Sequence, residues 1–325
     1  MHQLHIMPPL PASTASVATT DDSVDISVVI PAYHGAETIA ACLASVQRAT
    51  EGHRAEIVVV DSSGDRCGEI VRDQFPEVTL VLSPTRLSAG SARNRCVAIA
   101  RGRILFFVDQ DCVVPHDWIA ALEQHFSDPA TGGAGGSLGI LNPESLTGCG
   151  VYFLEFFRHF PQDAPPQRNR NFLLGSNCAY RADVLRDNGF PDQTLGEDVL
   201  LSHQMRQQGF ELLYDPRVEV LHRNREGREQ FFHYNTKMGT ASAADQLIMK
   251  RPRSRLFLRF PILAFLTPAV VLPVIFVRLL RCRKRRTYLP TFLRLLPLCL
   301  AGNMVWAAAF RREVLASRRR SSLSS

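Results

Sequence analysis

Residues Leu87–Pro115 read LSAGSARNRCVAIARGRILFFVDQDCVVP. A Gly/Ser-rich loop leads into helical spacing over Ala89–Ala100, and the apolar run Ile104–Val108 predicts a buried strand. Asp109 and Asp111 follow this strand at its carboxyl end, where open α/β sheets hold their ligands. Two carboxylates there favour a hard divalent cation, which fills the rest of its coordination shell with phosphate oxygens and water. The alternative is an acidic surface turn.

The segments before this stretch alternate between predicted strands and helices. Short β-branched runs at Ile26–Ile30, Ile57–Val60 and Val78–Leu82 are typical of strands that helices cover on both faces. Apolar spacing predicts one helix over Glu37–Arg48 and another through Ile70. Short connections between such units require parallel strands with right-handed crossovers. We therefore expect a nucleotide-binding type of sheet that lacks the Gly-x-Gly-x-x-Gly and Walker phosphate loops.

The segments after Pro115 predict further elements, with acidic residues at one helix start. In order, we expect a helix over Trp118–Phe126, a glycine run at Gly132–Gly136 that is either a flexible loop or an extra strand, a surface loop over Gln162–Asn171, a strand over Leu173–Tyr180, a helix over Arg181–Asn188, a helix from Gly196 to Gln208, and apolar runs at Phe210–Tyr214 and Val218–Leu221. Glu197 and Asp198 open the last helix, where acids ordinarily stabilise the helix dipole. His222 follows the last run, and a lone histidine there is more often structural than a ligand.

Charge divides the chain of 325 residues into two parts. The segment from residue 250 to the end carries seventeen lysines and arginines against one acid, whereas residues 1–249 carry twenty basic and thirty acidic residues. The basic residues flank apolar runs, which favours an anionic membrane surface over nucleic acid. Eight cysteines without a Cys-x-x-Cys pair favour reduced thiols in a cytosolic compartment and argue against a zinc site. Residues 1–24 predict a mobile arm, and we expect no signal peptide.

Two apolar runs characterise the basic tail. Phe260–Val277 is uncharged for eighteen residues and Leu295–Phe310 for sixteen, which makes both marginal membrane spans. Prolines are expected to break the first run, and the arginines of residues 278–286 lie between the two. A re-entrant or interfacial hairpin keeps these arginines on the cytosolic side, as the positive-inside tendency requires. The alternative is a pair of helices docked on the rest of the protein. Glu229–Met238 predicts a helix at the membrane border.

Six short motifs occur in a fixed order along the chain. They are SVVIPAY at 27–33, IVVVD at 57–61, ARN at 92–94, FFVDQD at 106–111, GSN at 175–177 and GED at 196–198. Together they resemble the family 2 glycosyltransferases with the GT-A fold, over about residues 25–220. The resemblance implies an α/β fold with a Rossmann-like, mainly parallel sheet flanked by helices, to which the basic tail adds a membrane-associated helical segment. It also implies inverting transfer from a nucleotide-diphosphate sugar with Mg²⁺ or Mn²⁺ as cofactor.

The resemblance also implies roles for individual residues. Pro31, Tyr33, Asp61, Arg93 and Asp109 would bind the nucleotide of the donor, Asp111 and His222 the metal; Asn177 and Gly196 would lie on the sugar side, and Asp198 would be the general base with Glu197 beside it. Two departures from the family pattern leave the identity of the donor's nucleobase open. Asp61 is followed by serines where a second acid is more usual, and Cys96 replaces a usual glycine.

These expectations combine into a membrane enzyme. We expect a glycosyltransferase domain over 25–250 and a membrane-associated tail over 251–325. The acceptor would be a lipid-linked or envelope polysaccharide or a glycolipid at the cytoplasmic face of the cell membrane, with no nucleic acid partner. One rival is a catalytically silent nucleotide-sugar-binding scaffold, which has no need of a base. Another is a nucleotidyltransferase, which would need a basic triphosphate cradle that Pro31–Gly35 does not offer.

Overall fold

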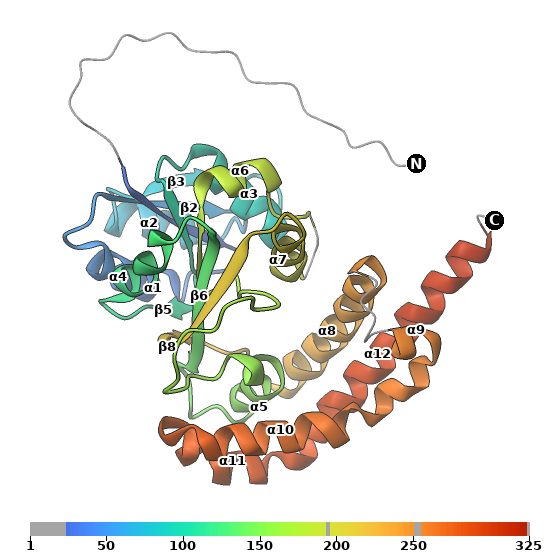
Figure 1. Ribbon diagram of the computed structural model, residues 1–325. Helices are drawn as coiled ribbons and strands as arrows, with labels where there is room; N and C mark the ends of the chain where they lie inside the picture. Colours follow the sequence, from blue (N-terminus) through green and yellow to red (C-terminus); the bar gives the residue numbers. More distant parts are fainter. Residues whose placement is uncertain (1–23, 193–195, 250–254, 324–325) are drawn as a thin grey trace, which may run out of the picture.

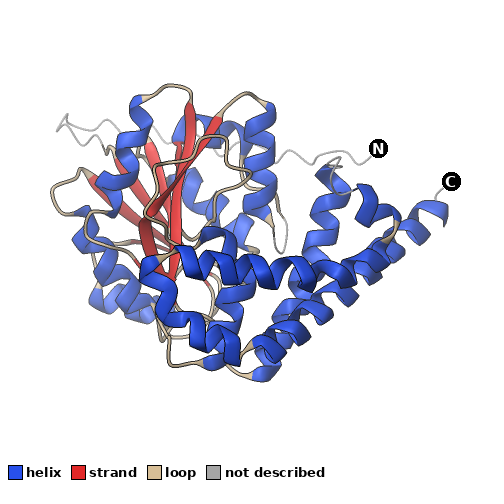
Figure 2. Ribbon diagram, turned by 60° about the horizontal axis from the view of Figure 1, so that its bottom comes forward, coloured by secondary structure: helices blue, strands red, loops and turns tan. Residues whose placement is uncertain are grey.

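The structure, a computed structural model, describes residues 24–192, 196–249 and 255–323. Residues 1–23 of the expected arm and the expected boundary at residue 250 lie outside this set. Helices cover both faces of a central sheet, and the carboxyl-terminal helices form an elongated group along one edge of the sheet domain (Figures 1 and 2).

The central sheet has eight strands in the order β3-β2-β1-β4-β7-β6-β8-β5. The strands are β1 Ile26–Ala32, β2 Ala55–Asp61, β3 Thr79–Leu82, β4 Ile104–Phe107, β5 Cys112–Val113, β6 Thr131–Ile140, β7 Cys178–Arg181 and β8 Glu211–His222. The pairs β1–β2, β1–β4, β2–β3 and β6–β8 are parallel, and the pairs of β7 with β4 and β6 and of β5 with β8 are antiparallel. The expectation of a mainly parallel sheet is confirmed.

The helices follow the expected alternation over the first half of the chain. They are α1 Ile39–Thr50, α2 Cys67–Gln74, α3 Ala89–Ile99, α4 Trp118–Glu123, α5 Leu146–Phe156, α6 Ala182–Asn188, α7 Glu197–Gln207, α8 Arg228–Met249, α9 Arg255–Arg259, α10 Thr267–Arg281, α11 Leu289–Arg294 and α12 Leu296–Leu323, with 3-10 turns η1 Gln124–Ser127, η2 Phe157–His159, η4 Pro261–Leu266 and η5 Arg283–Tyr288. The helices expected over residues 89–100, 181–188 and 196–208 are confirmed within two residues at each end.

The strand predicted over Leu173–Tyr180 is wrong for its first half. The amide of Leu173 donates to Ser202 Oγ at 3.2 Å and that of Gly175 to Asp198 Oδ2 at 3.2 Å. Side chains of α7 therefore take the hydrogen bonds that a strand would give to a neighbour. Only Cys178–Arg181 pairs in the sheet.

The glycine run at residues 132–136 belongs to strand β6, so the flexible-loop alternative is wrong. A Cβ on Gly136 would lie 2.1 Å from the carbonyl oxygen of Val218, which explains why β6 and β8 need glycine there. The two apolar runs predicted after residue 209 form one strand, β8. The register between β6 and β8 shifts after Gly136, which accommodates the polar residues between the two runs.

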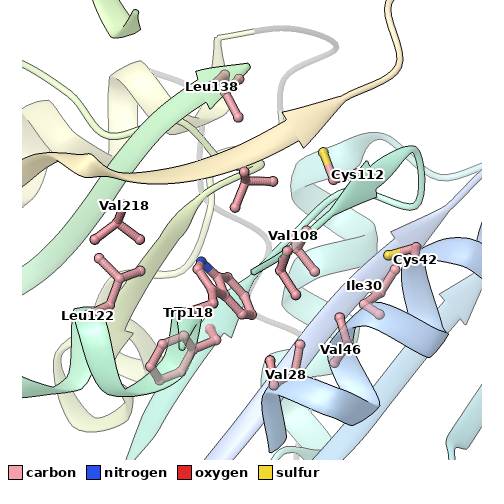
Figure 3. Close-up of a cluster of buried hydrophobic side chains, with 14 of the residues drawn as sticks. Val28, Ile30, Cys42, Val46, Val108, Cys112, Trp118, Leu122, Leu138 and Val218 are labelled. Atoms are coloured by element: carbon pink, nitrogen blue, oxygen red, sulfur yellow. The ribbon is translucent and has the colours of Figure 1, made fainter. Parts of the chain in front are cut away.

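A large apolar cluster fixes the sheet against α1 and α4. Trp118 and Leu122 of α4 lie against Val218 of β8, and Val28 and Val108 lie nearby (Figure 3). The Trp118 side chain is fully buried, so its indole N–H needs an acceptor. Asn177 Oδ1 accepts it at 2.9 Å.

The tail helices are docked on the rest of the protein by part of their surface. Ile275 and Leu279 of α10, Phe292 of α11 and Cys299 of α12 join the same apolar cluster as the sheet. A Cβ on Gly239 of α8 would lie 2.3 Å from the carbonyl oxygen of Trp306, so α8 and α12 pack closely. The docked alternative therefore describes part of the tail.

The remaining surface of the tail is apolar and exposed. Among the described residues, one helical stretch, Pro261–Arg281, is long and apolar enough to cross a membrane, and only 22% of its apolar 18-residue window is buried in the protein. The segments Arg285–Arg294 and Leu296–Arg320, bent by 78°, meet the same criterion when they are taken as one broken span. Pro273 lies inside α10 without ending it, contrary to expectation.

Candidate active site

A cleft of about 1760 Å³ opens at the carboxyl ends of β1 and β4 and continues to helices α8, α10 and α12. It brings together most of the residues that the sequence singled out: Pro31, Tyr33, Arg93, Asp109, Asp111, Gly196, Glu197, Asp198 and His222. They come from five elements far apart in the sequence, so the sheet assembles the site.

Gln110 fixes the turn that carries the two aspartates. Its side-chain oxygen accepts from the amide of Tyr33 and its side-chain nitrogen donates to the carbonyl of Tyr33, both at 2.8 Å. This pair of bonds ties the end of β1 to the turn after β4. Asp109 and Asp111 are thereby presented on one rim of the cleft, each about one third exposed at the side chain.

Arg93 of α3 links two of the acidic residues. Its guanidinium donates to Asp109 Oδ1 at 2.7 Å and to Glu197 Oε1 at 2.5 Å, and only 3% of the side chain is exposed. Burial lowers the pKa of Arg93, but the two carboxylates outweigh this and raise it above its ordinary value. Arg93 also lines the cleft, and the nucleotide contact expected for it stays a prediction. Its two ion pairs hold Asp109 and Glu197 in position.

Replacing Arg93 by methionine is expected to lower the free energy of unfolding by about 3–5 kcal/mol, because two carboxylates lose their buried partner. Denaturant unfolding of the purified protein measures this change. Arg95→Met on the same helix is the matched control, since Arg95 makes one long bond of 3.3 Å to Ser83 and no ion pair among the described residues. Equal stability of the two variants would contradict the bridging role.

Asp198 makes no ion pair with a lysine or arginine among the described residues. Its Oδ1 accepts from the amide of Val199 at 2.7 Å, and its Oδ2 accepts from that of Gly175 at 3.2 Å. Burial and the neighbouring Glu197 carboxylate raise the pKa of Asp198 to about 7, although Arg93 opposes this. Each oxygen keeps a lone pair. Asp198 can therefore exchange a proton near neutral pH, whereas Glu197 is bound to Arg93.

Asp111 and His222 form a pair that fits a divalent cation. Asp111 Oδ1 lies 3.6 Å from His222 Nε2, close enough for one ion to bind both atoms. His222 Nδ1 lies 3.1 Å from Asn224 Oδ1, which orients the ring. Cys112 Sγ is nearby, but burial and the adjacent aspartates raise the pKa of this thiol well above its ordinary value. An oxygen and imidazole donor set suits Mn²⁺ and, less well, Mg²⁺.

Two predicted residues lie outside the cleft wall. Asn177 is fully buried, and its side chain donates to the carbonyls of Ser137 at 2.8 Å and Val218 at 3.0 Å as well as accepting from Trp118. Its amide is fully used in joining β6, β8 and α4, so the sugar-side role expected for Asn177 is wrong. Asp61 is buried, and its Oδ1 accepts from the amide of Ser63 at 2.9 Å.

Gly196 precedes α7 with a φ of +85°, in the left-handed region that favours glycine. A Cβ there would also lie 2.6 Å from Asp245 Oδ2 of α8. Its role is thus to start the helix that carries Glu197 and Asp198, and to let α8 approach that start.

Comparison with known proteins agrees with this geometry. The model of the family described as glycosyl transferase family 2 matches residues 27–189, half of the chain. The chain belongs to this family. The glycosyltransferase AglE of Haloferax volcanii is 28% identical over 196 residues, 58% of this chain and 64% of AglE. The succinoglycan biosynthesis protein ExoO of Rhizobium meliloti is 27% identical over 242 residues, 70% of this chain and 68% of ExoO.

Among solved structures, the mannosyltransferase PcManGT from Pyrobaculum calidifontis, in complex with GDP-Man and Mn²⁺, has a TM-score of 0.57. The two chains are 18% identical, and the match covers 91% of this chain and 89% of PcManGT. This likeness concerns the fold and confirms the expected GT-A architecture. Against three curated relatives, the family 2 chain spans between 31% and 64% of the relative's length.

One group in the cleft of this family 2 protein was not predicted from the sequence. Tyr234 of α8 donates to Glu155 Oε1 of α5 at 2.5 Å, and the Arg225 guanidinium lies 4.2 Å from the centre of the Tyr234 ring. Burial raises the pKa of Glu155. Helix α5 was not predicted, so no pattern pointed to Glu155. The one available signal in the sequence was Arg225, which follows His222 by three residues and indicates a further charged group near the site.

Proposed function

We propose that this protein transfers a sugar from a nucleotide-diphosphate sugar to a lipid-linked acceptor, with inversion at the anomeric carbon. The observation that carries the proposal is the cleft in which Asp198, with a pKa of about 7, and the Asp111–His222 pair line one continuous wall. Family membership supports sugar transfer, and a silent scaffold would need no carboxylate with a raised pKa.

Asp111 and His222 would hold a divalent cation, for which their 3.6 Å separation fits. When bound, the cation would neutralise the negative charge that develops on the departing diphosphate. Asp109 and Tyr33, on the same rim, would hold the nucleotide side of the donor, with Arg93 keeping Asp109 in place. The complex of PcManGT with GDP-Man and Mn²⁺ supports this donor class.

Asp198 would take the proton from the acceptor hydroxyl as that oxygen attacks the anomeric carbon. Inversion in one step needs a single base on the face of the sugar opposite the leaving group, so one free carboxylate is enough. A pKa of about 7 leaves Asp198 largely ready to accept a proton at physiological pH. Glu197 would contribute by orienting the start of α7 through Arg93 rather than by accepting the proton.

The acceptor would be amphiphilic. Beyond Asp198 the cleft is lined by Gln230 and His233 of α8, and further on by the apolar Phe257, Leu266 and Val270. A sugar or phosphate headgroup suits the first part, and a lipid chain suits the second. The relative ExoO, a succinoglycan biosynthesis protein, supports a place in envelope polysaccharide synthesis.

The protein would lie at the cytoplasmic face of the membrane, held by the apolar surface of the tail. Washing membranes with high salt is expected to leave the protein bound, since salt screens charge but not apolar burial. Ile262→Asn with Val277→Asn should shift it towards the soluble fraction, because both side chains are exposed apolar groups of the tail. Quantitative blotting of the two fractions measures this distribution.

Leu82→Asn is the matched control for that experiment, since Leu82 is 52% exposed, between Ile262 at 58% and Val277 at 40%, but lies on the edge strand β3. Complete release of the unmodified protein by salt alone would contradict the proposed apolar attachment.

The function itself is tested by incubating the purified protein with Mn²⁺ and a panel of nucleotide sugars. Metal-dependent release of nucleoside diphosphate is the expected result, and binding without turnover for every donor would favour the scaffold.

A further inference from the structure

Three arginines meet where the chain after α5 lies against α10. Arg170 donates to the carbonyl oxygen of Arg158 at 2.5 Å. Arg278 donates to the same oxygen at 3.3 Å and to that of Phe157 at 3.2 Å. The guanidinium groups of Arg170 and Arg278 thus converge on one oxygen. That oxygen is the backbone carbonyl of Arg158, whose own side chain is the third arginine.

This arginine cluster (Arg158, Arg170 and Arg278) has no carboxylate partner among the described residues. The Arg158 side chain is exposed, and those of Arg170 and Arg278 are half-buried. Burial and the two neighbouring guanidinium groups lower the pKa of Arg170. By contrast Arg168, two residues from Arg170, pairs with Asp128 and with Glu211.

Two buried polar atoms beside the cluster also lack partners among the described residues. They are His159 Nε2 and Tyr214 Oη, and both side chains are about 1% exposed. The Arg170 guanidinium stacks on the Tyr214 ring at 4.3 Å, and the His159 and Tyr214 rings are 5.5 Å apart. Buried polar atoms without partners are uncommon and call for a bound group or water.

Capping of a helix end explains only part of the cluster. The carbonyls of Phe157 and Arg158 follow α5, and cations near such carbonyls are ordinarily favourable. That accounts for Arg170 and Arg278. It does not account for Arg158, whose guanidinium makes no hydrogen bond among the described residues and lies 5.5 Å from the Phe157 ring centre.

The location indicates which anion would complete the cluster. Arg278 lies in the last turn of the apolar stretch Pro261–Arg281, and Arg281 ends it. If this stretch enters the bilayer as proposed above, its charged end lies at the depth of the lipid phosphates. Guanidinium groups bind phosphate oxygens through paired hydrogen bonds.

We propose that the arginine cluster is a binding site for the phosphate of an anionic phospholipid. The lipid headgroup supplies the negative charge that the protein does not, and its acyl chains run along α10. Arg158 also lines the cleft of the candidate active site, whereas Arg170 and Arg278 lie outside its wall.

The test uses the purified full-length protein in detergent and short-chain dioctanoyl lipids. Phosphatidylglycerol is expected to raise the melting temperature, and the zwitterionic phosphatidylcholine is not. Arg158→Gln should weaken the phosphatidylglycerol effect about fivefold to tenfold in apparent affinity, as expected for one charge-assisted contact to phosphate. This variant removes no side-chain hydrogen bond found among the described residues. Arg168→Gln, on the same loop, is the matched control and should respond as the unmodified protein does.

A second variant keeps the test decisive. Arg158→Glu adds a carboxylate to the arginines, so the melting temperature without lipid should not fall and the response to phosphatidylglycerol should disappear. Equal responses to both lipids, or an unchanged response in Arg158→Gln, would overturn the site. If inorganic phosphate at the same concentration has the full effect of phosphatidylglycerol, the assignment to a lipid is wrong. The readout is binding, so it stands apart from any failure to detect sugar transfer.

Discussion

Asp198→Asn is expected to slow sugar transfer by about 10²–10⁴-fold, the usual contribution of a general base. Donor affinity should stay close to that of the unmodified protein, because asparagine keeps the oxygen that accepts from the Val199 amide. Single-turnover transfer and donor binding measured on one preparation separate the two effects. A role in helix capping alone would leave both unchanged, since asparagine caps a helix about as well as aspartate.

Asp183→Asn is the matched control for this change. Asp183 also lies in the first turn of a helix, α6, and its Oδ1 accepts from the next amide at 2.8 Å, as Asp198 does at 2.7 Å. Asp183 lies outside the cleft wall. It should therefore tolerate the substitution with near-normal turnover, and equal losses in the two variants would argue that helix stability, not proton transfer, is at stake.

The raised pKa of Asp198 predicts a pH dependence with a definite sign. Transfer at saturating donor should fall as the pH drops below about 7, where the base becomes protonated, and Asp198→Asn should lack this limb. Stability changes in the opposite sense. The folded-state pKa of Asp198 lies above its ordinary value of 3.8, so the contribution of Asp198 to stability is fully present below that pH and is lost as the pH rises through about 7.

Asp111→Asn is expected to abolish metal-dependent donor binding and, with it, transfer. The substitution removes a charged oxygen that lies 3.6 Å from His222 Nε2, leaving the imidazole as the sole strong donor of the pair. Titration of donor binding with Mn²⁺ measures the loss. Asp109→Asn is the comparison: its carboxylate pairs with Arg93, so donor binding should weaken while the response to metal is largely kept. Unchanged metal affinity in Asp111→Asn would remove the assignment.

Much of the sheet was predictable because local pattern and final environment agree. The runs Val28–Ile30 and Ile104–Phe107 are apolar on both sides, and both lie buried between helices. Asp109 and Asp111 follow such a strand directly, so their place at the rim of the cleft followed from the topology alone. The same holds for Glu197 and Asp198 at the start of α7.

The features of the fold and site that the sequence did not predict depend on contacts between distant segments. Leu173 lies in an apolar run, but Ser202 takes its amide, so no strand forms there. Asn177 stands in a matching motif, yet Trp118 and two carbonyls use its whole side chain. Ser202 is distant in sequence from Leu173, and Trp118 is distant from Asn177. Arg93 and the arginine cluster follow the same rule, since their function depends on which charges the fold brings to them.

The central proposal is that sugar transfer in this cleft inverts the anomeric carbon. The configuration of the first sugar product tests this inversion most directly. The purified protein, with Mn²⁺ and a nucleotide sugar that it turns over, can be followed by proton NMR from the first minutes of reaction, with water or a lipid-linked sugar as the hydroxyl acceptor. The account predicts that the new anomeric centre has the configuration opposite to that of the donor, with the signal absent in Asp198→Asn. A first product that keeps the donor's configuration would contradict it.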